Sequence, residues 1–181
     1  MNQSEDAGGH TPAGDQERSL LGHRRGSADA SEKATTMIPY LKTNIERIPL
    51  EILNQGNLQL IDELFAPEYV DHTPQPGVAP TRDGFRQWVS TLRMAFPDIE
   101  YTIDDTVEAG DKWVGRVTAS GTMTGDFEGM PATGKHATWS EIHILRIGDE
   151  QVIEHWGVVQ ELGMLIQLDV IPAPGQVPVA A

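Results

Sequence analysis

Residues 136–159 read HATWSEIHILRIGDEQVIEHWGVV and contain two extended segments joined by a short turn. Apolar and polar side chains alternate along residues 136–147, which is typical of a strand with one buried face. Residues 148–150 (GDE) have the composition of a turn, and residues 151–159 resume the extended pattern. The stretch therefore predicts a β-hairpin that supplies the last two strands of a sheet.

The same period of two extends back toward the middle of the chain. Ile99, Tyr101 and Ile103 alternate with polar residues, and a turn at residues 109–111 (AGD) leads into a second extended segment at residues 112–124. Four consecutive strands joined by short turns are expected to form an antiparallel sheet.

Before these strands, the apolar residues recur at helical spacing. Leu41, Ile45, Ile48 and Ile52 are separated by four, three and four positions, which predicts a helix with one buried stripe. Pro49 lies inside this helix and lacks a backbone N–H, so it should kink the helix or divide it into two short helices.

Further helices are indicated on both sides of the strands. Residues 58–65 form an amphipathic turn that should end before Pro67, and a short extended piece (YVDH) follows. Thr81 is expected to cap a third helix that ends at Pro97, and residues 162–168 predict a last short helix. Helices followed by a run of strands indicate an α+β fold, with helices covering one side of a strongly curved sheet.

Composition excludes several classes of function. The 181 residues include 13 basic and 27 acidic side chains, and this net charge of −14 repels nucleic acid and anionic membranes. The absence of cysteine excludes disulfides, thiolate metal sites and a cysteine nucleophile. No apolar run is long enough to span a membrane, and the first residues lack the features of a signal peptide. We therefore expect a cytoplasmic protein with no membrane partner.

The chain divides into three parts. Residues 1–36 contain only Leu20 and Leu21 as large aliphatic side chains, which predicts a disordered tail. Residues 37–172 form the expected single domain, and residues 173–181 are expected to be a flexible C-terminus. The change in pattern also makes Met37 a candidate for the biological start of the chain.

Four stretches together resemble the SnoaL-like polyketide cyclases, including their ester cyclase branch, of the nuclear-transport-factor-2-like superfamily. In chain order they are NQGNLQLIDELFAPEYVDH, GFRQWVSTLRMAFPDI, GTMTGDFEGMPATGKHATWSEIHILRI and VIEHWGVVQELGMLIQL, within residues 38–169. The resemblance implies an alpha+beta barrel or cone, in which a curved antiparallel sheet wrapped by helices surrounds a deep apolar pocket. It also implies ring closure by intramolecular aldol condensation without metal or cofactor. Dimers are common in the family, so the resemblance leaves a homodimer open.

Strand parity selects the first candidate site residues. Alternate residues of a strand face opposite sides, and this places Trp139, Glu141 and His143 together on the pocket face. A carboxylate and an imidazole two positions apart on one wall are suited to general acid–base chemistry. By the resemblance, His143 matches a pocket histidine of the antibiotic cyclases. In the alternative interpretation His143 is a hydrogen-bonded core histidine and Glu141 is its solvated partner.

The final strand departs from the family pattern. The resemblance implies a catalytic aspartate where this chain has Gly157, and in the ester cyclases an acid where it has Gln160. Parity alone places either His155 or the pair Glu154 and Trp156 in the pocket, and a bulge at the glycine would alter that assignment.

Asp71 and His72 form a third cluster, just before the proline-rich loop TPQPGVAP. By the resemblance this position lies near the pocket, so His72 is a candidate for a ligand or catalytic role. Alternatively, the aspartate only stabilises a turn by bonding to local backbone. Four aromatic side chains are assigned to the core rather than to the site: Phe85, Trp88, Phe96 and Tyr101.

The leading functional interpretation is a cofactor-free enzyme that acts on a small, bulky, apolar carbonyl compound. His143 or His72 would remove a proton next to the carbonyl, and Glu141 or His155 would orient the base or return the proton. The expected substrate-binding residues are Asp71, Trp139, Glu154 and Trp156. A pocket that binds an apolar metabolite without catalysis is the alternative. A metal site built from His72, His143 and Glu141 is chemically conceivable but lacks a ligand-spacing motif, so no metal is expected.

Overall fold

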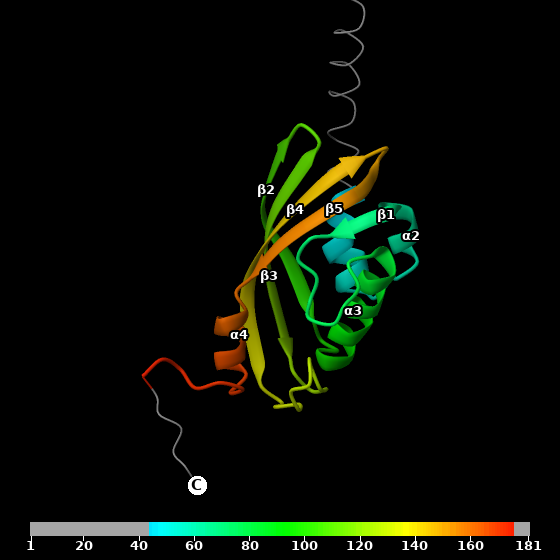
Figure 1. The fold of residues 1–181 in the computed structure, drawn as a ribbon. Coiled ribbons are helices and arrows are strands. Elements are labelled where there is room, and N and C mark those ends of the chain that lie inside the picture. The colour runs from blue at the N-terminus through cyan, green and yellow to red at the C-terminus, as the bar shows by residue number, and fades with distance from the viewer. Residues whose placement is uncertain (1–43, 176–181) are drawn as a thin grey trace, which may run out of the picture. The chain divides into compact units, whose positions relative to one another are not determined.

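The computed structural model describes residues 44–175 (Figure 1). The predicted disordered tail, the candidate start at Met37, the position of Leu41 and the last six residues of the chain lie outside the described residues.

Five strands form one sheet in the order β1-β5-β4-β3-β2. Their bounds are Phe65–Asp71 (β1), Glu100–Ala109 (β2), Lys112–Thr122 (β3), His136–Gly148 (β4) and Gln151–Val159 (β5). Strands β2 to β5 are consecutive and antiparallel, as the alternating sequence pattern predicted. The predicted and observed ends of β3, β4 and β5 differ by at most two residues, and the turns at residues 109–111 and 148–150 lie where the sequence placed them.

Strand β1 corrects two features of the predicted sheet. It pairs with β5 in parallel, with Asp71 opposite His155, so the sheet is mixed rather than antiparallel. Strands β1 and β2 form the two edges, so the sheet is open and is not a closed barrel. The YVDH piece was recognised only as extended chain, because sequence periodicity does not reveal which strand a segment joins. Pro67 fits within β1 because an edge strand leaves N–H positions unpaired.

All but the last of the helices lie on one side of this sheet, and the last packs against β4 away from the others (Figure 1). The helices are η1 (Ile48–Leu53), α2 (Leu60–Leu64), α3 (Arg82–Ala95) and α4 (Glu161–Gln167). Around Pro49 the chain forms a wide helical turn, in which the Pro49 carbonyl accepts from the Asn54 N–H at 3.0 Å. This wider turn takes the place of the predicted kink, since proline provides no N–H for the regular helical pattern. The second helix is shorter than expected, because Phe65 already belongs to β1.

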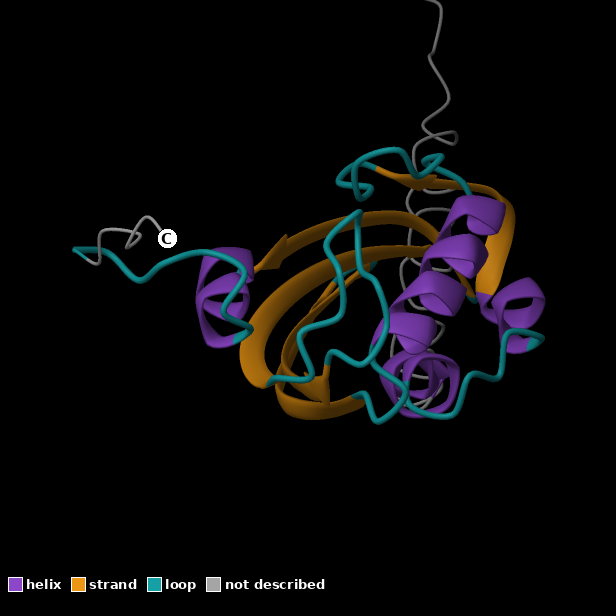
Figure 2. Cartoon of the chain, turned by 90° about the horizontal axis from the view of Figure 1, so that it is seen from below, coloured by secondary structure: helices purple, strands orange, loops and turns teal. Residues whose placement is uncertain are grey.

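Helix α3 begins and ends where the sequence indicated. The Thr81 side chain accepts a hydrogen bond from the Gly84 N–H at 3.2 Å, and Pro97 follows the helix end. Val89 and Leu92 are fully buried on its inner face. Figure 2 shows the strands curving around an interior that the helices flank on one side. This α+β arrangement is the cone expected from the sequence.

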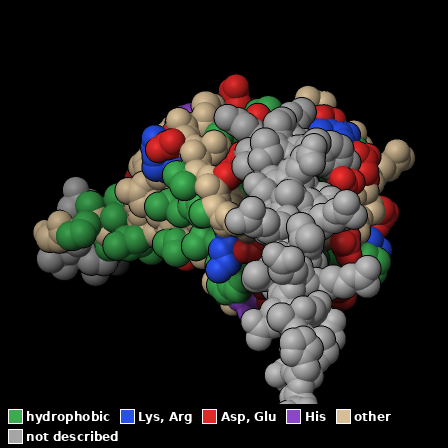
Figure 3. Space-filling model, turned by 90° about the horizontal axis from the view of Figure 1, so that it is seen from above, with side chains coloured by type: hydrophobic (Ala, Val, Ile, Leu, Met, Phe, Trp, Pro, Cys, Tyr) green, Lys and Arg blue, Asp and Glu red, His purple; other side chains and the backbone are tan. Residues whose placement is uncertain are grey.

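The outer face of the sheet remains open to solvent. Val158 at the end of β5 and Ile142 on β4 expose 73% and 49% of their surface, and Leu162 on α4 exposes 63%. On the face drawn in Figure 3, hydrophobic side chains gather in a continuous group and acidic side chains are spread over much of the rest. Within residues 44–175 no helix is long and apolar enough to cross a membrane.

Candidate active site

A cavity of about 260 Å³ lies between the concave face of the sheet and the helices. Its walls are mostly apolar side chains from helices and strands, among them Ile48, Leu53, Phe65, Phe85, Val117 and Leu145. A pocket of this kind, with few polar groups on apolar walls, is the usual form of a small-molecule site.

Alternate residues of the last two strands line this cavity. Glu141 and His143 contribute from β4, and His155 and Gly157 contribute from β5. The structure thereby resolves the parity of the final strand, since His155 faces inward. Trp139 is buried beside the cavity without lining it, because its indole ring packs against Phe96.

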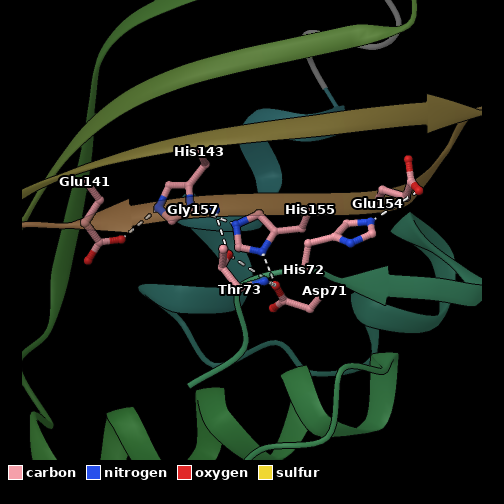
Figure 4. A network of polar contacts seen from close by, with 8 residues as sticks. All are labelled: Asp71, His72, Thr73, Glu141, His143, Glu154, His155 and Gly157. Atoms are coloured by element: carbon pink, nitrogen blue, oxygen red, sulfur yellow. Dashed lines mark hydrogen bonds and ion pairs between the residues drawn. The ribbon is translucent and has the colours of Figure 1, made fainter. Parts of the chain in front are cut away.

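Four side chains on this wall form one hydrogen-bonded chain, which we call the inner cluster (Figure 4). Asp71 Oδ1 lies 2.9 Å from His155 Nδ1. His155 Nε2 lies 3.0 Å from His143 Nδ1, and His143 Nε2 lies 2.8 Å from Glu141 Oε2. Two carboxylates therefore enclose two imidazoles in series.

Glu141 anchors one end of the inner cluster. Only 4% of its surface is exposed, so it is buried and is not the solvated partner of the alternative interpretation. Its Oε1 accepts from Trp139 Nε1 at 2.6 Å and from the Tyr101 hydroxyl at 3.3 Å. Burial, together with the Glu141 charge, raises the pKa of Tyr101 well above its ordinary value, so this hydroxyl remains a donor.

Asp71 anchors the other end. The parallel register of β1 and β5 places it opposite His155, and its Oδ1 also accepts from the Thr73 N–H at 2.9 Å. Burial alone would raise the pKa of Asp71, but the hydrogen bond and charge of His155 and the bonds from Thr73 outweigh it and lower the pKa. Asp71 is therefore an ionised acceptor at neutral pH.

The three contacts of the inner cluster together need three hydrogen atoms to be complete hydrogen bonds. Each contact needs one hydrogen, whereas two neutral imidazoles carry only two N–H groups. When both carboxylates are ionised, all three contacts are satisfied only if one imidazole is protonated. With one proton fewer, the two nitrogens without a carboxylate partner, His155 Nε2 and His143 Nδ1, face each other without a hydrogen between them.

Gly157 lies directly against these two nitrogens. A Cβ built at this position would lie 3.0 Å from His143 Nδ1 and 3.0 Å from His155 Nε2, closer than side chains normally approach. A larger residue here would have to displace the two rings by a few tenths of an ångström. The Gly157 N–H donates to Thr73 Oγ1 at 2.8 Å, which ties β5 to the loop that holds Asp71.

Three other predicted site residues, His72, Glu154 and Trp156, lie together with Arg146 in an outer cluster that does not line the cavity. His72 Nε2 lies 3.2 Å from Glu154 Oε1, and Glu154 also pairs with Arg146. The His72 ring stacks on Trp156 with centroids 4.5 Å apart. These side chains lie on the opposite face because Asp71 and His72, like His155 and Glu154, are neighbours with opposite parity. Their predicted roles in the pocket therefore have no support from their placement.

The hypothetical metal ligands are not brought together, because His72 lies on the outer face whereas His143 and Glu141 lie inside. In the described part of the chain, no three His, Asp or Glu side chains are arranged to hold a metal ion. Gln160, the second departure from the family pattern, precedes α4 and does not line the cavity.

Sequence reasoning missed several side chains of the cavity wall. Tyr101 is in the core as predicted, but it also hydrogen-bonds to Glu141, and Phe85 and Trp88 line the cavity. Thr73 and Trp113 were not singled out. The period of two that placed Tyr101 inward could have identified Trp113, whereas nothing local marks Thr73, which depends on the pairing of β1 with β5.

Comparison with known proteins identifies the family. The sequence model of the SnoaL-like polyketide cyclases matches residues 43–168, and the chain belongs to this family. Aklanonic acid methyl ester cyclase DnrD of Streptomyces peucetius is 31% identical over 124 residues, covering 68% of this chain and 75% of that protein. Nogalonic acid methyl ester cyclase of Streptomyces nogalater is 26% identical over 118 residues, covering 61% and 88%.

Solved structures agree with this assignment. TsrD from Streptomyces laurentii has a TM-score of 0.68 and 30% identity, and the match covers 74% of this chain and 98% of that one. The resemblance that the four sequence stretches indicated is confirmed, together with the fold that it implied.

Proposed function

We propose that this chain is a cofactor-independent cyclase-type enzyme that uses acid–base chemistry on a bulky, apolar carbonyl compound. The observation that carries the proposal is the inner cluster, a continuous Asp–His–His–Glu chain on the wall of an apolar cavity. Membership of the family and the methyl ester cyclases among its relatives support an acid methyl ester as substrate class.

Ring closure by aldol addition needs only proton transfers. A base takes a proton from the carbon next to a carbonyl, and the electrons of the broken C–H bond form an enolate. The enolate carbon attacks a second carbonyl within the same molecule, and the resulting alkoxide takes up a proton. Atoms and electrons balance without an oxidant, a reductant or a co-reactant, so correctly placed acid–base groups are sufficient.

Two further side chains favour a carbonyl ligand. The indole N–H groups of Trp88 and Trp113 are buried and have no hydrogen-bond acceptor among residues 44–175, although both side chains line the cavity. A buried donor without a partner is costly, by about 1–3 kcal/mol. A small displacement of either ring toward a ligand oxygen would remove this cost, whereas a hydrocarbon ligand would not.

The test is turnover of aklanonic acid methyl ester by the purified full chain, followed by chromatography of the cyclised product. We expect turnover by the wild type and a decrease of about 10²–10⁴-fold in kcat for His143→Gln, with a smaller effect on ligand affinity. His136→Gln is the matched control, because His136 lies on the same strand but is exposed. Equal turnover by the His143 variant and its control would contradict the role of His143.

A binding protein without catalysis is the second candidate. It is favoured by one observation, that each of the four ring nitrogens of His143 and His155 lies within 3.0 Å of another polar atom of the inner cluster. If the wild type binds aklanonic and nogalonic acid methyl esters with defined stoichiometry but converts neither, the binding function is the better account.

A further inference from the structure

We propose that His143 and His155 act together as one base that holds a single mobile proton, in place of the aspartate that the family resemblance implies at Gly157. This inference rests on the proposed function and specifies which atoms carry the chemistry. The proton is received between His143 Nδ1 and His155 Nε2, and it is later returned to the substrate alkoxide.

The position of the two ring nitrogens beside Gly157 is the first argument for a paired base. A side chain at residue 157 would start 3.0 Å from both nitrogens, so these atoms occupy the space into which a carboxylate from this position would project. Both rings line the cavity, and their side chains remain 23% and 17% exposed. The absence of a Cβ at Gly157 therefore leaves room for the two nitrogens to approach each other at the cavity wall.

The number of hydrogens available to the inner cluster is the second argument for a paired base. The inner cluster has three contacts, and its outer two are satisfied by the N–H groups of two neutral imidazoles that donate to Asp71 and Glu141. The central contact at 3.0 Å then lacks a hydrogen, and this is where a proton taken from the substrate is accommodated. The cation that forms lies between Asp71 and Glu141, each of which accepts a hydrogen bond from one of the two rings.

Asp71 and Glu141 are positioning residues in this scheme. Each fixes the tautomer of the neighbouring ring by accepting its N–H, so that the remaining nitrogen of each ring points toward the other ring. Thr73 holds Asp71 through its N–H and holds Gly157 through its hydroxyl oxygen, which keeps β1 and β5 at the spacing that the pair requires.

The closing experiment compares His143→Gln, His155→Gln and the double variant in turnover of aklanonic acid methyl ester. Glutamine forms hydrogen bonds but does not take up a proton. We expect each single variant to lose about 10²-fold or more, and the double variant to be no worse than the more damaged single variant, because groups that act as one unit are not additive. Circular dichroism and the affinity for aklanonic acid methyl ester verify that each variant is folded.

A second measurement uses the unmodified protein. In ¹⁵N-histidine-labelled wild type, the scalar coupling between His143 Nδ1 and His155 Nε2 should be absent while the central contact lacks a hydrogen, and should appear when the pH is lowered until the pair takes up its proton. Wild-type turnover with an undamaged His155→Gln, multiplicative losses in the double variant, or no coupling at any pH at which the protein stays folded would each overturn the paired base but not the proposed enzymatic function. Absence of wild-type turnover would overturn the proposed function itself.

Discussion

The inner and outer clusters both pair histidine with carboxylate and both take side chains from β4 and β5, but their surroundings differ. In the inner cluster, carboxylates and imidazoles are enclosed by the cavity wall, and Glu141 is almost fully buried. In the outer cluster, His72 and Glu154 are accessible to water. Residues adjacent in sequence, such as His155 and Glu154, belong to different clusters. The comparison shows that residue type and spacing identify candidates, whereas the face of the sheet decides what they can do.

The largest expected difference between the clusters is in stability. Glu141→Ala removes the acceptor of Trp139 Nε1, His143 and the Tyr101 hydroxyl at once, inside the protein. We expect it to lower the free energy of unfolding by roughly 3 kcal/mol, as is typical when one partner of a buried charged network is removed. Urea unfolding followed by circular dichroism measures the change.

Glu154→Ala is the matched variant of the outer cluster. Its partners His72 and Arg146 remain hydrated after the change, so its unfolding curve should nearly coincide with that of the wild type. Equal losses for the two variants would show that the faces do not differ in the way the structure indicates.

The sequence predicted the fold more completely than the site. Alternation of residues 136–147 placed Glu141 and His143 on one face correctly, because a strand enforces parity regardless of its neighbours. The same rule left His155 and Glu154 undecided, since only the pairing of β5 with β4 and β1 shows which face is inside. The contact between Asp71 and His155 joins residues 84 positions apart, and local patterns carry no information about such a pairing.

The structural role of Gly157 could not be predicted from the sequence either. Read alone, it is a missing carboxylate, which argued against catalysis. In the structure it is the point where the imidazole rings of His143 and His155 approach the backbone, so two titratable side chains lie where residue 157 itself provides none. Which of these interpretations applies depends on side chains from another strand.

A smaller loss of stability is expected when a side chain at residue 157 prevents the two imidazole rings from approaching the backbone. Gly157→Ala places a methyl group 3.0 Å from His143 Nδ1 and His155 Nε2, so the rings must separate. We expect a loss of about 1–3 kcal/mol in stability, as for other overpacked interiors, and reduced turnover. Gly157→Asp should behave similarly and should not restore a family-type site, since the rings occupy its space.

Gly163→Ala provides the control for this substitution. A Cβ there would meet only the flexible side chain of Gln160, at 3.2 Å, and the glycine lies within α4. Thermal unfolding and turnover are measured on both variants. If Gly157→Ala is as stable and as active as the control, the two rings are not held in contact at this position.

The smallest expected effect concerns pH and salt. The pKa of Asp71 is lowered from its ordinary value of 3.8 in the folded protein, chiefly by His155 against the opposing effect of burial. A carboxyl group of this kind stabilises the fold fully above its unfolded pKa, and this contribution is lost as the pH falls through the lower folded pKa. Asp71→Asn should therefore be less stable than the wild type near neutral pH, and the difference should shrink below about pH 3.8.

The salt dependence of stability should distinguish the Asp71 variant from a variant of the outer cluster. The pKa of Glu154 is also lowered, by the hydrogen bond to Arg146 and then by His72, so Glu154→Gln should show a pH dependence of the same sign. Its charges face water, and 1 M NaCl, where the screening length is about 3 Å, should remove the difference from the wild type. The difference for Asp71→Asn should persist more fully, because the His155 and Asp71 side chains are largely buried and buried pairs are screened much less by salt. Urea unfolding between pH 7 and pH 3, at low and high salt, measures both. A difference at Asp71 that disappears in 1 M salt would mean that the inner cluster is as open to solvent as the outer one.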